Sequence, residues 1–377
     1  MRSNDRTGEV APRETRPALT AGRAVKLVVE LTDRCNLRCG HCPSGRHGGR
    51  AELPLGLLER LVPQARANGI GHLSFTGGEP TLHSRFADIV GLTAGAGLDW
   101  SMVTNGWSLP KHLETLQRHR ARLGMITFSL DGAREATHDA LRGRGSYRRV
   151  LQAASACVLR GLPFSFNMTL TRHNRGEIEA AVALAKGLGA LGLRFGHLMS
   201  DPNPASRDLE MGPEARKALD AELHALQAAS DFPVGFTPGG WREALFPCAP
   251  LQDLELNLDW QGRLGLCCHL SGFQGADAAT VADLHSMDLA EALAALAARR
   301  QAFKAQKRAH AADGDWRDDD HFPCWYCAKH VGAVDWIRAQ PDHPWFAALT
   351  GAAEPHAPRA FVGAAQAVGT CLPESNG

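Results

Sequence analysis

Apolar residues between about positions 25 and 200 form short runs, and longer stretches with a helical repeat separate them. The short runs are expected to be strands at 25–31, 72–76, 99–104, 125–130, 163–170 and 191–198. Amphipathic helices are expected near 55–68, 84–96, 110–120, 147–160 and 176–187. Strands that alternate with helices in this way form parallel βα units. The pattern therefore predicts an α/β fold. It has six units, which is fewer than the eight of a closed barrel. We expect a partial (β/α)6 TIM-like barrel rather than a doubly wound sheet.

The pattern changes after about residue 200. One helix is expected after Pro213 and another over 288–306, and the alternation in DLELNLDWQGRLGLCC predicts a hairpin around Asp259–Gly262. These elements indicate a small C-terminal α+β unit. The predicted organisation is a disordered segment over 1–24, the barrel over 25–205, the C-terminal unit over 206–345 and a flexible tail over 346–377.

Charge and composition argue against several classes of protein. Lys and Arg number 41 against 40 Asp and Glu, so no basic field is available to attract nucleic acid. No apolar run approaches the roughly 18 residues of a membrane helix, and segment 1–24 lacks the apolar core of a signal peptide. We therefore expect a cytoplasmic protein with neither nucleic acid nor membrane as a partner. In that reducing compartment, clustered cysteines favour metal binding or catalysis over disulfides.

Three of the ten cysteines lie in the motif CNLRCGHC, directly after the first predicted strand: Cys35, Cys39 and Cys42. The spacing also fits one face of a buried helix, but Gly40 and the polar neighbours favour a loop at the end of a strand. A structural zinc site completed by His41 or His47 is a further alternative. Three thiolates can also hold a 4Fe–4S cluster and leave one iron without a protein ligand. A cluster in which every iron has a protein ligand needs four thiolates.

CNLRCGHC resembles the CxxxCxxC loop of radical S-adenosylmethionine (SAM) enzymes. FTGGEPTLH, after the second strand, resembles their GGEP motif, and VTNG and FSLDG at the ends of the next two strands are similar to family motifs. The resemblance covers about residues 25–200. It implies that SAM binds the open iron, and that an electron delivered by a flavodoxin or ferredoxin cleaves SAM to a 5′-deoxyadenosyl radical. That radical removes a hydrogen atom from the substrate.

The resemblance also implies a set of SAM-binding residues. These are His41, Gly77, Gly78, Glu79, Asn105, Ser129, Asn167 and Thr169, with Arg172 as an alternative to Thr169. The glycines would allow close backbone approach to SAM, Ser129 would contact its carboxylate, and His41 would lie beside its adenine. As isolated residues, the asparagines and Ser129 would also suit turns or caps.

A second set of cysteines lies in the C-terminal unit: Cys248, Cys267, Cys324 and Cys327, with Cys268 beside the second. Taken alone, two cysteines, a hairpin and a CxxC motif also suit a zinc ribbon. Because these cysteines follow a barrel segment in the sequence, their order resembles that of the twitch domain, a shortened SPASM domain. This resemblance implies one auxiliary 4Fe–4S cluster. Cys268 would replace Cys267 as ligand, pack in the core, or donate hydrogen to a substrate radical. Cys157 is expected to be buried packing.

The cysteine order resembles single-twitch aminocyclitol dehydrogenases. It implies an oxidoreductase that dehydrogenates a small polar substrate such as an amino sugar, with the auxiliary cluster accepting the second electron. The candidate catalytic residues for the loss of a proton from the substrate radical are Arg194 and His197, at the end of the sixth strand. The alternatives are a maturase that crosslinks, oxidises or epimerises a ribosomally made peptide, and a non-catalytic zinc or redox protein. Segment 1–24 is shorter than a peptide-recognition domain, which favours the small molecule.

Overall fold

The computed structural model describes residues 25–42, 49–271 and 279–352. The expected disordered segment 1–24 lies outside the described residues, as does the expected tail from residue 353 onward. Residues 346–350 form a helix with Ala348 and Leu349 buried, so the folded unit extends beyond the predicted boundary at 345.

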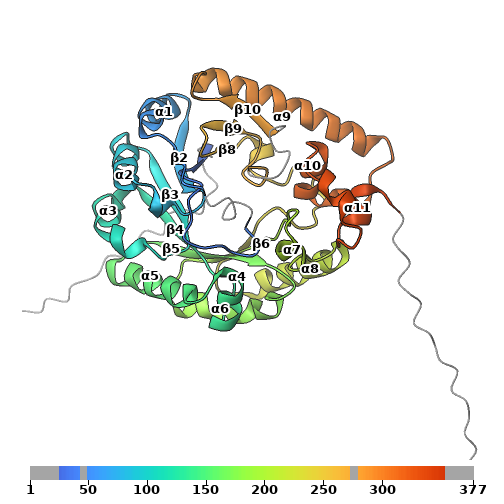
Figure 1. Ribbon diagram of the computed structural model, residues 1–377, viewed down its shortest axis with the longest axis horizontal. Helices are drawn as coiled ribbons and strands as arrows, with labels where there is room; N and C mark the ends of the chain where they lie inside the picture. Colours follow the sequence, from blue (N-terminus) through green and yellow to red (C-terminus); the bar gives the residue numbers. More distant parts are fainter. Residues whose placement is uncertain (1–24, 43–48, 272–278, 353–377) are drawn as a thin grey trace, which may run out of the picture.

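A single ten-stranded sheet organises the chain, in the order β10-β9-β8-β1-β2-β3-β4-β5-β6-β7. Its first seven strands are β1 (Val25–Glu30), β2 (Ile70–Thr76), β3 (Asp99–Thr104), β4 (Leu123–Ser129), β5 (Phe164–Leu170), β6 (Leu193–His197) and β7 (Val234–Phe236). All seven pair in parallel with their neighbours. The sheet curves inside an outer ring of helices (Figure 1). The predicted α/β fold with a partial barrel is confirmed.

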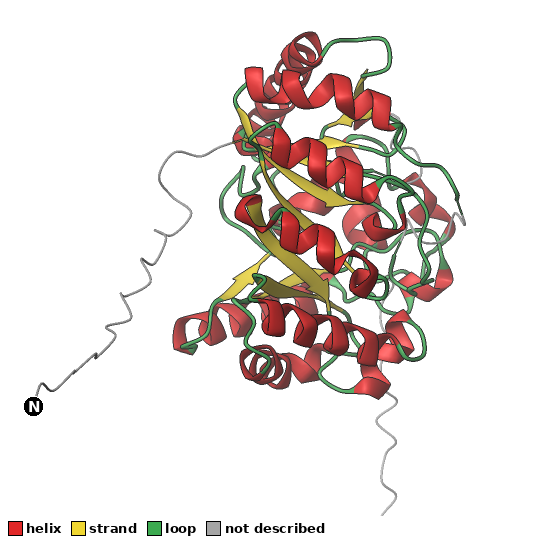
Figure 2. Cartoon of the chain, turned by 90° about the vertical axis from the view of Figure 1, so that its left-hand side faces the viewer, coloured by secondary structure: helices red, strands yellow, loops and turns green. Residues whose placement is uncertain are grey.

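Helices cover the outer side of the strands (Figure 2). In the barrel they are α1 (Leu55–Ala67), α2 (Phe86–Gly95), α3 (Leu113–Arg118), α4 (Glu135–Arg142), α5 (Ser146–Arg160) and α6 (Ile178–Gly187). The sequence pattern missed α4, which is only eight residues long and ends at Gly143 with φ 111°. The C-terminal helices are α7 (Pro204–Arg207), α8 (Pro213–Ala229), α9 (Leu289–Ala312), α10 (Pro323–His330) and α11 (Phe346–Thr350).

The strands present apolar residues to the helices and many polar residues to the barrel interior. On β1, Leu27 and Val29 are buried in the core, whereas Lys26 and Glu30 line an interior cavity. This two-residue alternation follows from the pleat of a strand. Interior side chains bond across strands: His72 Nε2 lies 2.8 Å from Ser101 Oγ, Ser101 Oγ 3.1 Å from Ser74 Oγ, and Thr127 Oγ1 3.1 Å from Ser165 Oγ. The barrel therefore encloses polar surface.

The C-terminal strands β8 (Glu255–Leu258), β9 (Arg263–Gly265) and β10 (Thr280–Asp283) continue the barrel sheet. Strand β8 pairs in parallel with β1, and β8 and β9 form the predicted antiparallel hairpin. Gly262 provides the positive φ of 78° that this turn requires. An incomplete barrel leaves the edge of β1 unpaired, and an unpaired edge readily accepts another strand. The C-terminal unit is thus joined to the barrel through backbone hydrogen bonds.

Candidate functional site

The cysteine loop leaves the end of β1 and is bonded directly to the GGEP loop after β2. Gly78 N donates to Thr32 O at 2.7 Å, and Glu79 N donates to Arg34 O at 2.8 Å. A Cβ on Gly77 would lie 2.4 Å from Thr32 O, and one on Gly78 would lie 2.3 Å from Arg34 O. Both glycines are therefore required for the close approach of the two loops. Their predicted approach to SAM is a separate role.

We expect Gly78→Ala to displace the cysteine loop, because its Cβ would overlap a backbone carbonyl that cannot rotate away. Overpacking of this kind typically costs about 1–3 kcal/mol. The matched control is Gly56→Ala on α1, where a Cβ meets nothing within 4 Å and alanine favours the helix. Thermal unfolding and iron content after anaerobic reconstitution measure the effect. Equal iron content in the two variants would show that the loop contact is dispensable.

A cavity of about 340 Å³ lies beside these two loops, at the carboxyl ends of the barrel strands. It brings together most of the residues predicted for the site: Cys35, Cys39, His41, Cys42, Gly77, Gly78, Glu79, Asn105, Ser129, Thr169 and His197. They come from the ends of six different strands. Parallel strands place their carboxyl ends at one edge, which is where βα barrels carry their active sites.

Glu79 holds the end of β3 against the GGEP loop. Its carboxylate is fully buried and accepts hydrogen bonds from Thr81 N at 3.2 Å, Thr104 Oγ1 at 2.8 Å and Asn105 N at 2.8 Å. Asn105 Nδ2 in turn lies 3.9 Å from Cys35 Sγ. Because its oxygens are occupied by protein donors, Glu79 acts on the cavity by positioning Asn105.

A buried ion network lies behind the cysteine loop and was not predicted. Asp131 is paired with Arg142 at 2.5 Å and with His41 at 3.3 Å, and it accepts a bond from Thr169 N at 2.8 Å. Burial opposes ionisation of Asp131, but Arg142 and His41 more than compensate and lower its pKa. Arg142 also reaches Cys39 Sγ at 3.9 Å. The network places a cation beside a cysteine thiol.

Three of the predicted residues lie elsewhere. Asn167 does not line the first cavity, and its Oδ1 accepts a hydrogen bond from Arg194 Nε at 3.4 Å. Arg194 borders a different cavity, so it does not share one with His197. Arg172 donates to Glu210 O at 2.9 Å and 3.1 Å, away from the cavity, because the segment after β6 passes next to it. His47 lies outside the described residues.

The second cavity, of about 470 Å³, contains the C-terminal cysteines. Cys248, Cys267, Cys268, Cys324 and Cys327 all line it, together with Lys26, Glu30 and Arg194 from the barrel interior. The two cavities share Thr76, Gly77, Val103, Cys268 and His269 as lining residues. Both Cys267 and Cys268 border the second cavity, so both stay candidates for the predicted fourth ligand. Cys157 is buried in the core, as predicted.

A buried cation lies near the second cysteine set. Lys307 is 1% exposed, its Nζ lies 4.4 Å from the centre of the Tyr326 ring, and among the described residues no carboxylate pairs with it. Burial lowers the pKa of Lys307, whereas negative charge on the three nearby cysteines and on Asp320 favours its charged form. A buried cation without a counterion is costly. The residues therefore fit an anionic group held by thiolates at this position.

Both cysteine sets fit an iron–sulfur cluster in their donor chemistry. Burial raises the pKa of Cys39 and of Cys327 to about 12, so each thiol is neutral until a metal displaces its proton. Within the described residues, no three His, Cys, Asp or Glu side chains converge on a site for a single metal ion. The cysteines instead line the walls of two cavities.

Residues 29–185 match the family model described as the radical SAM superfamily. This segment belongs to the radical SAM superfamily. The match contains the cysteine loop, the GGEP loop and the buried network of Asp131, and it confirms the family predicted for the barrel. The resemblance of the C-terminal unit to a twitch domain, and of the protein to aminocyclitol dehydrogenases, stays a prediction.

Curated proteins are similar to about half of the chain. The chain is 32% identical over 178 residues to "PqqA peptide cyclase" of Ruegeria pomeroyi, covering 46% of this chain and 47% of that protein. It is 36% identical over 191 residues to "GTP 3′,8-cyclase" of Caulobacter vibrioides, covering 48% and 54%. The chain thus spans about half the length of these relatives.

Solved structures share the fold. Streptococcus suis SuiB bound to S-adenosylmethionine has a TM-score of 0.57 and 16% identity, covering 67% of this chain and 62% of that one. "Native anSMEcpe with bound AdoMet" has a TM-score of 0.55 and 16% identity, covering 71% and 79%. In the part of the chain described here, no helix has the length and apolar character needed to cross a membrane.

Proposed function

We propose that this protein is a radical SAM enzyme that modifies a peptide. The observation that carries the proposal is the first cavity, where Cys35, Cys39 and Cys42 meet the GGEP loop and the polar ends of β3, β4 and β5. Cys35, Cys39 and Cys42 would hold a 4Fe–4S cluster, with SAM beside it. That cluster, with SAM, supplies the electron transfer that generates a 5′-deoxyadenosyl radical.

The residues of the chain hold and orient these groups. Arg142 stabilises the Cys39 thiolate once metal binding has released its proton, and Asp131 fixes the guanidinium. Ser129, Thr169 and Asn105 supply hydrogen-bond partners for the charged end of SAM. Thr76 and Cys268 line both cavities, so the two cavities are adjacent.

A peptide is the favoured substrate because a relative at 32% identity carries the name "PqqA peptide cyclase". A solved structure with a similar fold is SuiB bound to the precursor peptide SuiA, with a TM-score of 0.59. A reactive peptide side chain would enter the polar barrel interior, and the rest of the peptide would stay at the rim. A flavodoxin or ferredoxin would deliver the electron.

The second candidate is an oxidoreductase that dehydrogenates a small polar molecule such as an amino sugar. The polar interior supports it, because Glu30, Ser74 and Arg194 line the second cavity and offer hydrogen bonds that an apolar substrate would leave unused. For both candidate functions, one auxiliary 4Fe–4S cluster is held by Cys248, Cys324 and Cys327. Its fourth ligand is either Cys267 or Cys268. A closed four-thiolate cluster has no open position for substrate.

Metal analysis tests both cluster assignments. After anaerobic reconstitution we expect about eight iron and about eight sulfide per chain, four of each from each 4Fe–4S cluster. Replacing all three cysteines of the first loop with alanine should leave about half of each. Stoichiometric zinc without sulfide would contradict the assignment and support the zinc alternative.

A substrate screen then separates the two candidates. Reduced enzyme is incubated with SAM and either short synthetic peptides or amino sugars, and products are detected by mass spectrometry. A crosslinked, oxidised or epimerised peptide supports the first candidate, and a ketone formed from an amino sugar supports the second. Failure of the wild-type enzyme to form any 5′-deoxyadenosine would refute both.

A further inference from the structure

His197 is the last residue of β6, and it forms a buried pair with Asp220 on α8. Its Nε2 lies 2.7 Å from Asp220 Oδ1, and the side chains are 3% and 6% exposed. The other oxygen, Oδ2, accepts a hydrogen bond from Trp241 N at 2.6 Å. Burial opposes ionisation of Asp220, yet the hydrogen bond from His197 lowers its pKa. The carboxylate is therefore ionised and has no proton to donate.

The state of Asp220 determines which nitrogen of His197 carries the proton. An ionised carboxylate is only an acceptor, so Nε2 must be the donor, and Nδ1 of the neutral ring then has a free lone pair. Nδ1 is buried, and among the described residues it has no hydrogen-bond partner. Buried polar atoms are nearly always satisfied by protein, water or ligand. Because His197 lines the first cavity, a molecule bound there can supply the missing donor.

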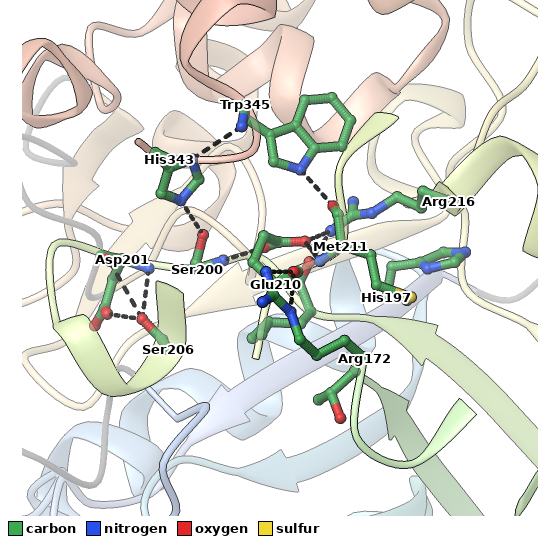
Figure 3. Close-up of polar contacts among 12 residues, drawn as sticks. Arg172, His197, Ser200, Asp201, Ser206, Glu210, Met211, Arg216, His343 and Trp345 are labelled. Carbon is green, nitrogen blue, oxygen red and sulfur yellow. Dashed lines mark hydrogen bonds and ion pairs between the residues drawn. The ribbon is translucent and has the colours of Figure 1, made fainter. Parts of the chain in front are cut away.

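The chain that follows His197 is held by a network of polar contacts (Figure 3). Arg216 donates to Leu198 O, directly after His197, and forms a buried ion pair with Glu210 at 2.5 Å. Glu210 also accepts a hydrogen bond from Ser200 N at 2.9 Å, and Arg216 stacks 4.9 Å from the centre of the Trp345 ring. The end of β6 is thus held by α8 and by the C-terminal segment, and His197 has little freedom to reorient.

We propose that His197, oriented by Asp220, accepts a proton from an O–H or N–H group of the substrate in the first cavity. The proposal rests on the proposed function for the identity of that cavity. The substrate O–H or N–H bond breaks, its electron pair stays on the oxygen or nitrogen, and a new bond forms at Nδ1. The resulting imidazolium is stabilised by Asp220. His197 is the proton acceptor, and Asp220 is a positioning residue.

The first test measures the tautomer of His197 in the reconstituted, oxidised full chain, without substrate. Nitrogen NMR of protein labelled at histidine should show His197 protonated at Nε2 and bare at Nδ1. His197→Gln assigns the signal by its absence. In Asp220→Asn the preference for the Nε2–H tautomer should be lost, because an amide can either donate or accept. A proton on Nδ1 in the wild type would overturn the proposal. This result does not depend on whether the enzyme cleaves SAM.

The second test compares product with 5′-deoxyadenosine, using the substrate found in the screen above. His197→Gln should still form 5′-deoxyadenosine, while its product per 5′-deoxyadenosine falls about 100-fold, within the range of a lost general base. The matched control, His173→Gln, changes an exposed histidine outside the cavity and should behave as wild type. An unchanged ratio in His197→Gln, with the fold intact by circular dichroism, would overturn the proposal. Absence of 5′-deoxyadenosine in the wild type would instead refute the proposed function.

The pH profile separates proton acceptance from a purely structural role. His197 accepts a proton only when neutral, so product per 5′-deoxyadenosine should fall as the pH drops through its pKa, which burial lowers below its ordinary value. Asp220, Glu210, Arg216 and Arg242 are the charged groups around it. Asp220→Asn removes the anion that stabilises imidazolium, so the acid limb should move to lower pH. A structural role alone would leave that limb in place.

Discussion

Replacing Cys39 by alanine is expected to abolish SAM cleavage and to remove about half of the iron of the reconstituted protein. Cys39 is 7% exposed, lies within reach of Arg142 and lines the first cavity with the other two cysteines of its loop. With one of three thiolates missing, the first cluster cannot be held in place. Formation of 5′-deoxyadenosine by the dithionite-reduced variant measures the effect, and the loss should be complete within the detection limit.

The chain offers a matched control for this substitution. Cys157→Ala also removes a buried thiol, but Cys157 lies in the hydrophobic core between α5 and the sheet. We expect it to lower the free energy of unfolding by about 1 kcal/mol and to leave iron content and SAM cleavage unchanged. If Cys39→Ala kept the activity of this control, the first cysteine loop would not be the site of SAM cleavage.

Replacing Cys327 by alanine is expected to remove a similar share of the iron but to spare SAM cleavage. Cys327 lines the second cavity only, so the first cluster and SAM cleavage should persist, while about half of the iron is lost. Oxidised product should also be lost, because the second electron of the substrate needs an acceptor. Mass spectrometry of the product, together with 5′-deoxyadenosine formation, separates these two outcomes.

The stability of the Cys327 variant needs its own control, because Lys307 is buried beside the cysteines. Loss of the anionic group would leave its charge without compensation, at a typical cost of 3–5 kcal/mol. The double variant Cys327→Ala/Lys307→Met removes both charges and should recover much of the unfolding free energy without restoring iron. If folded Cys327→Ala made oxidised product at the wild-type rate, the auxiliary cluster would be structural only.

Sequence alone was sufficient for the features that depend on local order. Each of these features depends on a few consecutive residues: the alternation on β1, the spacing of Cys35, Cys39 and Cys42, and the glycines of the GGEP loop. Strand and helix periods follow directly from backbone geometry. For this reason the six barrel strands, the hairpin at Asp259–Gly262 and the family of the barrel segment were all predicted correctly.

Only the tertiary structure decided which distant side chains meet. Arg142, the last residue of α4, reaches Cys39, and Asp131, which follows β4, reaches His41. His197 at the end of β6 meets Asp220 on α8. The same applies to Lys307, on α9, whose charge lies near the thiols of Cys248 and of two cysteines on α10. Such pairs have no fixed sequence spacing, since each depends on how barrel curvature brings separate elements together. The separation of Arg194 from His197 has the same origin: they lie three residues apart on β6, yet they border different cavities.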